Sequence, residues 1–386
     1  MMNVSDKIKY VGVDDLDIDL FESQYVVPEG MSYNSYVILD EKTAVMDTVD
    51  ARKTDEWINN VKATLGNKSL DYIVCLHMEP DHAGSMMKAM ETFPTAKVVG
   101  NAKTFTYMAQ FFDVNLEGRK VEVKDGESLS LGEHNLTFVC APMVHWPEVM
   151  VAYESSEKVL FAADAFGKFG AISKYDGDWA CEARRYYFNI CGKYGVQVQS
   201  LLKKAAALDI KTIAPLHGPV LKENLGYYLD LYNTWSSYGV ESEGVLVAFA
   251  SIHGNTRKAA EKIASILEEQ GAKKVVVSDL SRDDEAEVIE DAFRYGKMII
   301  AAPTYDGGLF PPMESFLSHL KSKNYQKRTV GIIENGTWAP MSGKLMKAAL
   351  ESMKEIKICD TVVTIKSALK AEQEDSLVAL AKEVLA

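Results

Sequence analysis

The strongest constraint on the fold lies in residues 244–386, where unbroken apolar runs alternate with stretches of helical character. The apolar runs are GVLVAFAS, KVVVSDL, MIIAAPT, TVGIIEN and DTVVTI. Between and after them come a helical stretch following Thr256, then DEAEVIEDAF, ESFLSHL, SGKLMKAALESM and the C-terminal segment. Strands that are apolar on both faces and alternate with helices predict a parallel sheet covered on both sides. We therefore expect a doubly wound α/β domain here.

The sequence before residue 243 has a different character. It begins with the strand-like runs SYVILD and KTAVMDTV and continues as a mixture of strands and helices. The stretch GYYLDLYNTWSSYGVESEG predicts a helix followed by a polar linker. A chain of 386 residues has room for two or three buried cores. We therefore expect two domains, residues 1–243 and residues 244–386.

Several apolar runs in the first part lead into a side chain that can bind a metal. DYIVCL leads into the segment HMEPDHAGS, which holds four such residues, His77, Glu79, Asp81 and His82. LTFVCAPMV leads into His145, KVLFAAD ends on Asp164, and IKTIAPL leads into His217. Functional groups in layered α/β folds gather at the carboxyl ends of strands. The repetition therefore predicts one metal centre built from separate strand ends.

The composition of this set predicts two metal ions rather than one. Four imidazoles and three carboxylates are too many ligands for a single transition metal, and Asp164, isolated on its own loop, is the best candidate for a bridging ligand. Zinc sites favour histidine and cysteine, whereas added carboxylates favour iron or manganese with open positions. The alternative is that HMEPDHAGS is only a polar strand-to-helix loop, with Asp81 capping a helix near Ala83–Gly84.

The second part contains a loop suited to a phosphate. After GVLVAFA comes SIHGNTRKAAEKIASIL, in which Ser251, Asn255 and Thr256 offer polar groups at a helix N-terminus and Gly254 permits close backbone approach. No lysine follows in the GKT or GKS manner, so this is not a nucleotide-hydrolysing P-loop. A hydroxyl-rich loop without lysine is typical of flavin mononucleotide (FMN) binding, although Gly-rich αβ loops are also common as ordinary turns.

Two later loops, APTYDGGLFPPM (302–313) and ENGTWAPMSG (334–343), follow strands of the same predicted sheet and carry aromatic residues where a flavin ring would rest. The candidate cofactor-binding residues of the three loops are Ser251, His253, Gly254, Asn255, Thr256, Pro303, Thr304, Tyr305, Asp306, Gly307, Asn335, Gly336, Thr337 and Trp338.

Cysteine content and charge exclude several classes of protein. The five cysteines form no CxxC pair, which argues against a disulfide framework, a zinc ribbon or a Cys-ligated iron–sulfur site. A net charge of −13 argues against a nucleic-acid partner. No apolar run approaches the roughly 18 residues of a membrane span, and the N-terminal segment lacks the apolar core of a signal peptide. We expect a cytoplasmic protein without membrane association.

The whole chain resembles the flavodiiron proteins, also called A-type flavoproteins. The resemblance rests on HxExDH at 77–82 followed by His, Asp and His, on the opening GMSYNSYVI (30–38), and on the fused flavodoxin-like part. Zinc hydrolases of the same fold usually have HxHxDH, whereas this chain has Glu79 at the middle position. The resemblance implies a metallo-β-lactamase-like αββα sandwich followed by a flavodoxin-like domain, here without an appended rubredoxin domain. ENGTWAP lacks the Gly-Trp-Ser-Gly pattern of many members, which leaves the ring contacts of the flavin open.

The same resemblance implies the cofactors and the reaction. His77, Glu79 and His145 would ligate one iron of a diiron pair, Asp81, His82 and His217 the other, and Asp164 would bridge them. Such a protein reduces O2 to water, NO to N2O, or both, with electrons passing from an external donor through FMN to the irons. The donor is a rubredoxin, a flavin reductase or reduced deazaflavin. A head-to-tail homodimer would place the flavin of one chain beside the irons of the other. The preference between gases depends on neighbours of the ligands, such as the tyrosines of 186–194.

Two other functions remain open from the sequence. One is a zinc hydrolase of the glyoxalase or β-lactamase type with an accessory flavodoxin-like domain, against which Glu79 and the fused flavin loops count. The other is an electron carrier whose metal site is only structural, against which the seven ligands count. Hydrolysis of a thioester or lactam would favour the first, and absence of gas consumption by the reduced protein would favour the second.

Overall fold

The computed structural model describes residues 4–386, which divide into two compact units. The first unit runs to Tyr187 and resumes at Tyr194–Asn233, and the second comprises Phe188–Lys193 and Thr234–Ala386. None of the helices in the described residues combines the length and the apolar character that crossing a membrane requires.

The first unit contains two main sheets. In spatial order, the strands of the first sheet are β1 (Ile8–Tyr10), β6 (Tyr36–Ile38), β7 (Ala44–Met46), β8 (Tyr72–Val74), β9 (Lys97–Gly100) and β10 (Lys120–Glu122). Those of the second are β11 (Ser128–Ser130), β12 (Asn135–Cys140), β13 (Met150–Glu154), β14 (Val159–Phe161) and β15 (Thr212–Ala214). Two small ribbons pair β2 (Val13–Asp15) with β5 (Met31–Tyr33) and β3 (Leu20–Phe21) with β4 (Tyr25–Val26).

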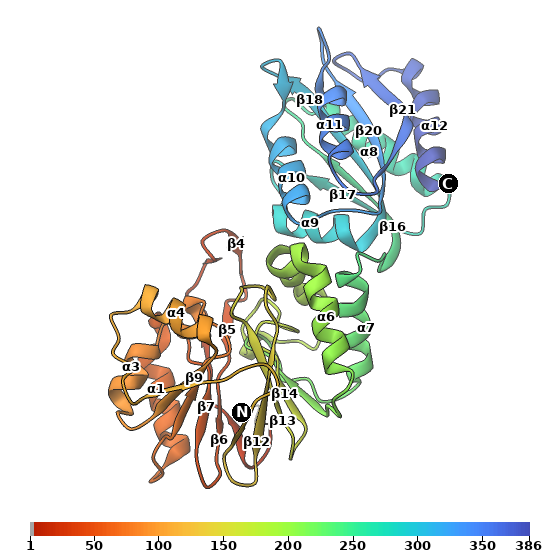
Figure 1. The fold of residues 1–386 in the computed structure, drawn as a ribbon. Coiled ribbons are helices and arrows are strands. Elements are labelled where there is room, and N and C mark those ends of the chain that lie inside the picture. Colours follow the sequence, from red (N-terminus) through yellow and green to blue (C-terminus); the bar gives the residue numbers. More distant parts are fainter. Residues whose placement is uncertain (1–3) are drawn as a thin grey trace. The chain divides into compact units, whose positions relative to one another are not determined.

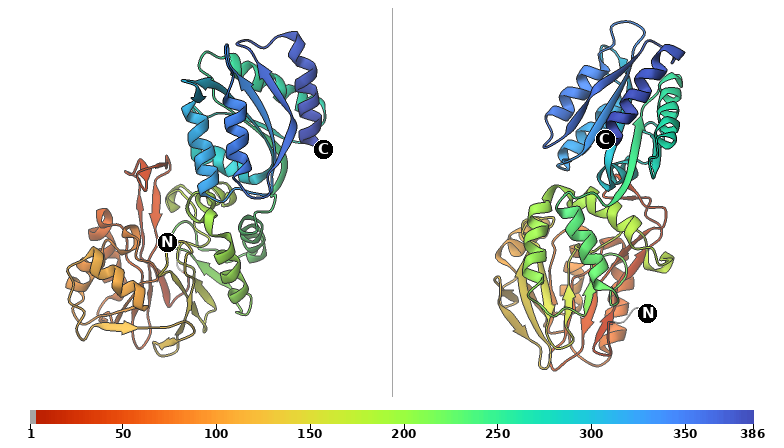
Figure 2. Two further views of the ribbon diagram at one scale, coloured as in Figure 1. Left: turned by 45° about the horizontal axis from the view of Figure 1, so that its top comes forward. Right: turned by 90° about the vertical axis from the view of Figure 1, so that its right-hand side faces the viewer.

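Helices cover the outer faces of these two sheets, as Figures 1 and 2 show. The helices are α1 (Thr54–Leu65), α2 (Pro80–Ala83), α3 (Met86–Thr92), α4 (Ala102–Phe111), α5 (Ala180–Tyr186), α6 (Gly195–Ala205) and α7 (Leu225–Ser236). Helices α1, α3 and α4 flank the first sheet, and α6 and α7 flank the second. The inner faces pack together, because the ring centroids of Tyr36 on β6 and Phe161 on β14 lie 5.5 Å apart. The predicted αββα sandwich is confirmed.

The second unit is built on one parallel sheet, as the alternation of apolar runs and helices predicts. Its strands, in spatial order, are β17 (Val275–Asp279), β16 (Ser242–Phe249), β18 (Tyr295–Tyr305), β20 (Thr329–Asn335) and β21 (Lys357–Ile365), and every neighbouring pair is parallel. The helices are α8 (Asn255–Glu269), α9 (Glu285–Arg294), α10 (Pro311–Ser322), α11 (Ser342–Glu351) and α12 (Glu374–Leu385).

Both faces of this sheet are covered. Apolar side chains of α8 and α12, such as Ile263 and Leu380, form a buried core with strand residues such as Val247, while α9, α10 and α11 lie on the other face (Figure 1). Because the strand order reverses direction at β16 and β18, the loops after these strands diverge and leave a crevice at the carboxyl edge.

Arg328 connects several backbone segments of the second unit, and we predict that its replacement lowers the stability of the fold. This buried guanidinium donates to the backbone carbonyls of Tyr295, Tyr238 and Gly239, at 2.8, 2.8 and 3.0 Å. Arg328→Met would leave several buried carbonyls without donors, so we expect a loss of about 3 kcal/mol in unfolding free energy, measured by chemical denaturation. Arg282→Met, which removes a largely exposed arginine, is the matched control; equal stability of the two variants would contradict this role.

Candidate metal centre and nucleotide pocket

All seven residues that the sequence predicts as metal ligands lie in two adjoining clusters of the first unit. Within each cluster, one possible ligand atom from each residue lies within 4.8 Å of the others. The first cluster contains His77, Glu79, His145 and Asp164, and the second contains Asp81, His82 and His217.

The strand ends explain why these residues meet. His77 follows β8 of the first sheet, whereas His145, Asp164 and His217 follow β12, β14 and β15 of the second. β14 and β15 are parallel, and β12 runs in the same direction because both β12 and β14 are antiparallel to β13. The three loops of the second sheet therefore leave from one edge and meet the loop that follows β8.

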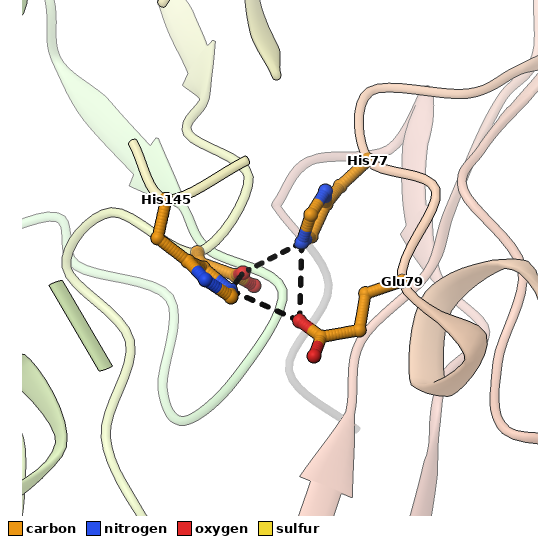
Figure 3. Close-up of side chains that lie close together, drawn as sticks. His77, Glu79 and His145 are labelled. Carbon is orange, nitrogen blue, oxygen red and sulfur yellow. Dashed lines mark hydrogen bonds and ion pairs between the residues drawn. The ribbon is translucent and has the colours of Figure 1, made fainter. Parts of the chain in front are cut away.

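The first cluster is drawn in Figure 3, where the side chains of His77, Glu79 and His145 point toward one another. Glu79 Oε2 lies 3.2 Å from His77 Nε2 and 2.9 Å from His145 Nε2. Asp164 Oδ2 lies 3.3 and 3.1 Å from the same two ring nitrogens. Two imidazoles and two carboxylates thus surround a single point.

The second cluster repeats this arrangement around the other oxygen of Asp164. Asp81 Oδ2 lies 3.2 Å from the Nε2 atoms of both His82 and His217. Asp164 Oδ1 lies 3.0 Å from His82 Nε2 and 3.7 Å from His217 Nε2. Each oxygen of Asp164 therefore faces a different cluster, which is the geometry of a carboxylate shared between two cations.

The residues present fit a pair of cations. Both carboxylate oxygens of Asp81 and of Asp164, and Nε2 of His82 and His217, are buried, and apart from the close approaches within the clusters given above they have no hydrogen-bond partner among the described residues. Buried polar atoms without partners are costly, and two cations would satisfy all of them together. The mixed histidine and carboxylate set without cysteine favours iron or manganese over structural zinc. Asp81 does not cap a helix, since α2 begins at Pro80 and takes Glu79 as its N-cap.

The electrostatics of the site couple metal binding to proton release. Burial alone would lower the pKa of His145, but the carboxylates of Asp164 and Glu79 outweigh it and raise this pKa to about 9. The pKa of His77 is raised for the same reason. Burial would raise the pKa of Asp164, but the charges of His82 and His77 hold it well below its usual range. A cation must displace the protons on these imidazoles, so binding releases them.

Glu148 is a functional residue that the sequence reasoning missed. Its fully buried carboxylate accepts from His77 Nδ1 at 2.8 Å and from the backbone N–H of Met78 at 2.9 Å. An acceptor on the second ring nitrogen fixes the tautomer that leaves Nε2 free to bind a metal. The only sequence feature that pointed to Glu148 is its position three residues after His145, in HWPE. Its partner His77 lies 71 residues earlier, so the sequence alone does not reveal the contact.

Two other groups position the predicted ligands. His217 Nδ1 donates to the backbone carbonyl of Ser32 at 2.7 Å, which fixes its tautomer in the same way. Asp47 accepts from the backbone N–H groups of Leu76 and His77 at 2.7 and 3.3 Å and so holds the start of the ligand loop. Burial raises the pKa of Asp47 to about 7.

Aromatic side chains enclose one side of the site. The ring centroids of Tyr186, Phe21 and Tyr33 lie 5.4, 5.5 and 6.1 Å from that of His217. Phe21 comes from the β3–β4 ribbon, whose turn also carries Glu22. Desolvation and the charge of Glu79 raise the pKa of Glu22 to about 7. Of the tyrosines in 186–194, Tyr186 is therefore in direct contact with a predicted ligand.

The predicted nucleotide site corresponds to a pocket of about 510 Å³ in the second unit. Every predicted cofactor-binding residue lines it except Gly254, which precedes α8 with a φ of +84° and donates its N–H to Ser251 Oγ. Sequence reasoning missed four further lining residues, Ile252, Ala339, Met341 and Ser367. Ser367 belongs to the loop after β21, so a fourth strand end contributes to the pocket.

The loops of this pocket are connected to one another. Asn335 donates to Thr256 Oγ1 at 3.3 Å and to the carbonyl of Ser367 at 2.9 Å, and it accepts from the N–H of Ser367 at 3.1 Å. The N-terminus of α8 supplies unpaired backbone N–H groups, which suit a phosphate. At the mouth, the exposed fractions of Trp338 and Tyr305 are 81% and 45%, so both present ring faces to which a flat ligand can bind. The pocket thus fits a flavin mononucleotide.

One predicted loop of this pocket contains regular structure. Residues 302–313, predicted as a single loop, contain the end of β18, a two-residue strand β19 (Gly308–Leu309) paired antiparallel with it, and the start of α10 at Pro311. Asp306 and Gly307 form the turn, with φ values of +50° and +73°. Asp-Gly is the preferred pair where both central residues of a hairpin turn need positive φ, so the sequence contained a signal for this hairpin.

Comparisons with known proteins agree with both units. Residues 31–218 match the family profile of the ODP family beta lactamases, and residues 246–363 match that of a flavodoxin domain. The chain is 30% identical over 329 residues to an uncharacterized protein of Methanocaldococcus jannaschii, covering 83% of this chain and 81% of that protein. It is 29% identical over 393 residues to a nitric oxide reductase of Moorella thermoacetica, covering 99% and 98%.

Solved structures show the same two-part architecture. The rubredoxin oxygen:oxidoreductase of Desulfovibrio gigas superposes with a TM-score of 0.92 at 25% identity, covering 99% of this chain and 97% of that one. The flavodiiron protein of Giardia intestinalis shares the fold with a TM-score of 0.93 at 24% identity, covering 99% and 96%. Together with the paired metal clusters and the flavin pocket, these matches show that the chain belongs to the flavodiiron proteins, oxidoreductases whose cofactors are FMN and a pair of irons.

Proposed function

We propose that this protein reduces NO to N2O, O2 to water, or both, with electrons passing from an external donor through FMN to the diiron site. The observation that carries the proposal is the position of Asp164, whose two oxygens each face one of two adjoining clusters. A relative named nitric oxide reductase and a structural neighbour named rubredoxin oxygen:oxidoreductase support the two gases. Two NO, two electrons and two protons give one N2O and one water; one O2, four electrons and four protons give two waters.

In this proposal His77, Glu79 and His145 would hold one iron, Asp81, His82 and His217 would hold the other, and Asp164 would be shared between them. When bound, the irons supply adjacent sites for the gas, and the flavin supplies electrons. The chain provides the positioning. Glu148 and the carbonyl of Ser32 orient the ligand rings, Asp47 holds the ligand loop, and the aromatic rings around His217 exclude water from that side.

Two further parts of the proposal concern assembly and partners. We propose that residues 1–243 form the domain that holds the metal ligands and residues 244–386 the domain that holds the flavin. We further propose a head-to-tail homodimer in which the flavin of each chain delivers electrons to the irons of its partner. A dilute monomer that kept normal flavin-to-iron transfer would contradict this. The electron donor would be a rubredoxin, a flavin reductase or reduced deazaflavin. We also propose a cytoplasmic location, because the five cysteines form no CxxC pair and do not indicate a disulfide framework.

The function is tested by gas consumption. Purified protein loaded with iron and FMN, and reduced by an artificial electron donor, is placed under limiting NO or O2 in a sealed electrode cell. We expect catalytic consumption of at least one gas, with N2O as the product of NO. Protein that holds both cofactors but consumes neither gas, or that hydrolyses a thioester or lactam, would contradict the proposal.

The role of Glu148 carries a separate prediction. Glu148→Ala removes the acceptor from His77 Nδ1, and we expect iron affinity to fall about 10- to 100-fold, as is typical when the partner of a metal-binding histidine is lost. Glu148→Gln keeps an acceptor oxygen and should lose less. Competition with a graded iron chelator measures both. Glu133→Ala is the matched control, because that glutamate is exposed and lies before β12, whereas His145 follows the other end of the same strand. Iron affinity of Glu148→Ala equal to that of the control would contradict the role.

A further inference from the structure

Besides the nucleotide pocket of the second unit, the structure has a cavity of about 380 Å³ in the first unit, which the proposed mechanism does not use. It lies between the second sheet and helices α6 and α7. Phe161 faces the other sheet, so its neighbours Leu160 and Ala162, which alternate with it along the strand, face the helices and form the floor. Side chains such as Leu201 of α6 and Leu229 of α7 form the roof.

Fourteen of the sixteen residues that line this cavity are apolar. Its polar side chains are Asp230 and Asn233, both exposed on α7 at the mouth, and the floor residues are buried. Protein interiors are close-packed, and voids much larger than a water molecule are rare. An apolar cavity of about 150 Å³ stays dry and binds benzene or xenon. The cavity between the second sheet and the two helices is larger and partly open to solvent, but its buried apolar floor likewise favours an apolar guest over water.

The cavity adjoins the segment that carries the bridging carboxylate. Ala162, Ala165 and Phe166 line it, and Asp164 lies between them with its carboxylate on the cluster side. The sequence FAADAF places alanines on both sides of Asp164, and one of these neighbours, Ala165, lines the cavity. Phe166, which also lines the cavity, stacks on Tyr232 of α7 with ring centroids 4.1 Å apart.

We propose that this cavity binds the dissolved diatomic substrate, O2 or NO, and holds it beside the diiron site. The inference rests on the proposed function, because only a gas-consuming centre needs such a store. Both gases are small, uncharged and poor hydrogen-bonding partners, so their transfer from water into an apolar space is favourable. Charged species such as protons gain nothing from such a transfer. Gas arriving through the helices would also leave the edge at Glu79, whose side chain is 14% exposed, to the flavin that delivers the electrons.

Xenon tests the cavity without reference to turnover. Crystals of the iron- and FMN-loaded protein are pressurised with xenon and measured by anomalous diffraction. We expect a xenon peak between the sheet and helices α6 and α7. Absence of xenon from the cavity, or elongated density of an acyl chain filling it, would overturn the inference while leaving the proposed function intact.

A substitution that fills the cavity tests whether gas binding there contributes to turnover. Ala205→Phe on α6 projects a ring into the space, and we expect it to displace xenon and to raise KM for the gas about tenfold through slower entry, with kcat, iron content and FMN content unchanged. Leu229→Phe fills the same space from α7 if the first variant folds poorly. Val196→Phe, on the exposed side of α6, is the control. Loss of xenon with an unchanged KM would overturn the role, whereas wild-type protein that binds xenon but consumes no gas would refute the proposed function instead.

Discussion

Asp164→Ala is expected to remove both irons and to abolish gas consumption. Each oxygen of this carboxylate faces one cluster, at 3.0 Å from His82 Nε2 and 3.1 Å from His145 Nε2. Its loss removes one ligand from each cation and the negative charge between two dications, so neither metal retains its affinity. Iron per chain, measured by elemental analysis after anaerobic loading and desalting, should fall from about two to near zero. FMN content should stay unchanged because the flavin pocket lies in the other unit.

Two controls separate this effect from misfolding. Asp209→Ala removes an exposed carboxylate that pairs with Lys158 and Lys211, and should leave iron and activity unchanged. Asp164→Asn keeps the size of the side chain but not its charge, and should also lose most of its iron. An Asp164→Ala protein that still carried two irons and turned over gas would show that the two clusters do not share this ligand.

Asn255→Asp is expected to weaken FMN binding about 100-fold, or about 2.7 kcal/mol. Asn255 is the first residue of α8 and lines the flavin pocket. A carboxylate there would oppose the phosphate, and like charges in contact cost several kcal/mol. The same carboxylate is favourable for the helix itself, since acidic residues stabilise helix N-termini. The substitution therefore separates cofactor affinity from folding.

The measurement is fluorescence titration of the apoprotein with FMN, together with thermal unfolding of the apoprotein. Ser265→Asp places the same charge on the exposed side of α8, away from the pocket, and should bind FMN as the wild type does. Unchanged FMN affinity in Asn255→Asp would place the phosphate elsewhere. A drop in apoprotein stability would instead assign the effect to the fold.

The second unit could be predicted from sequence almost element by element. Each strand is an apolar run bounded by polar residues, and TVGIIEN, for example, matches β20 from Thr329 to Asn335. Local pattern is sufficient there because parallel strands buried on both faces need continuous apolar runs. The hairpin at Asp306–Gly307 escaped because the aromatic and glycine content of the segment indicated a ligand loop, although Asp-Gly also marks a turn.

The strands of the first unit were harder to predict than the residues that form its two clusters. Many of its strands span three residues, such as β7 and β15, too short to show a period. The candidate ligands could be recognised because each apolar run leads into a histidine or a carboxylate. Glu148 and Asp47 could not, because an acidic residue outside a motif resembles any surface charge, and only the fold brings Glu148 to His77. The cavity beneath α6 and α7 likewise depends on packing that no local pattern reports.

The central claim, a diiron site shared across Asp164, is tested most directly by anomalous diffraction from crystals of the iron-loaded protein, with data collected on both sides of the iron absorption edge. The account predicts two iron peaks, one between Asp164 Oδ2, His77, Glu79 and His145, and the other between Asp164 Oδ1, Asp81, His82 and His217. A single peak, or scattering that appears at the zinc edge and not at the iron edge in protein supplied with iron, would contradict it.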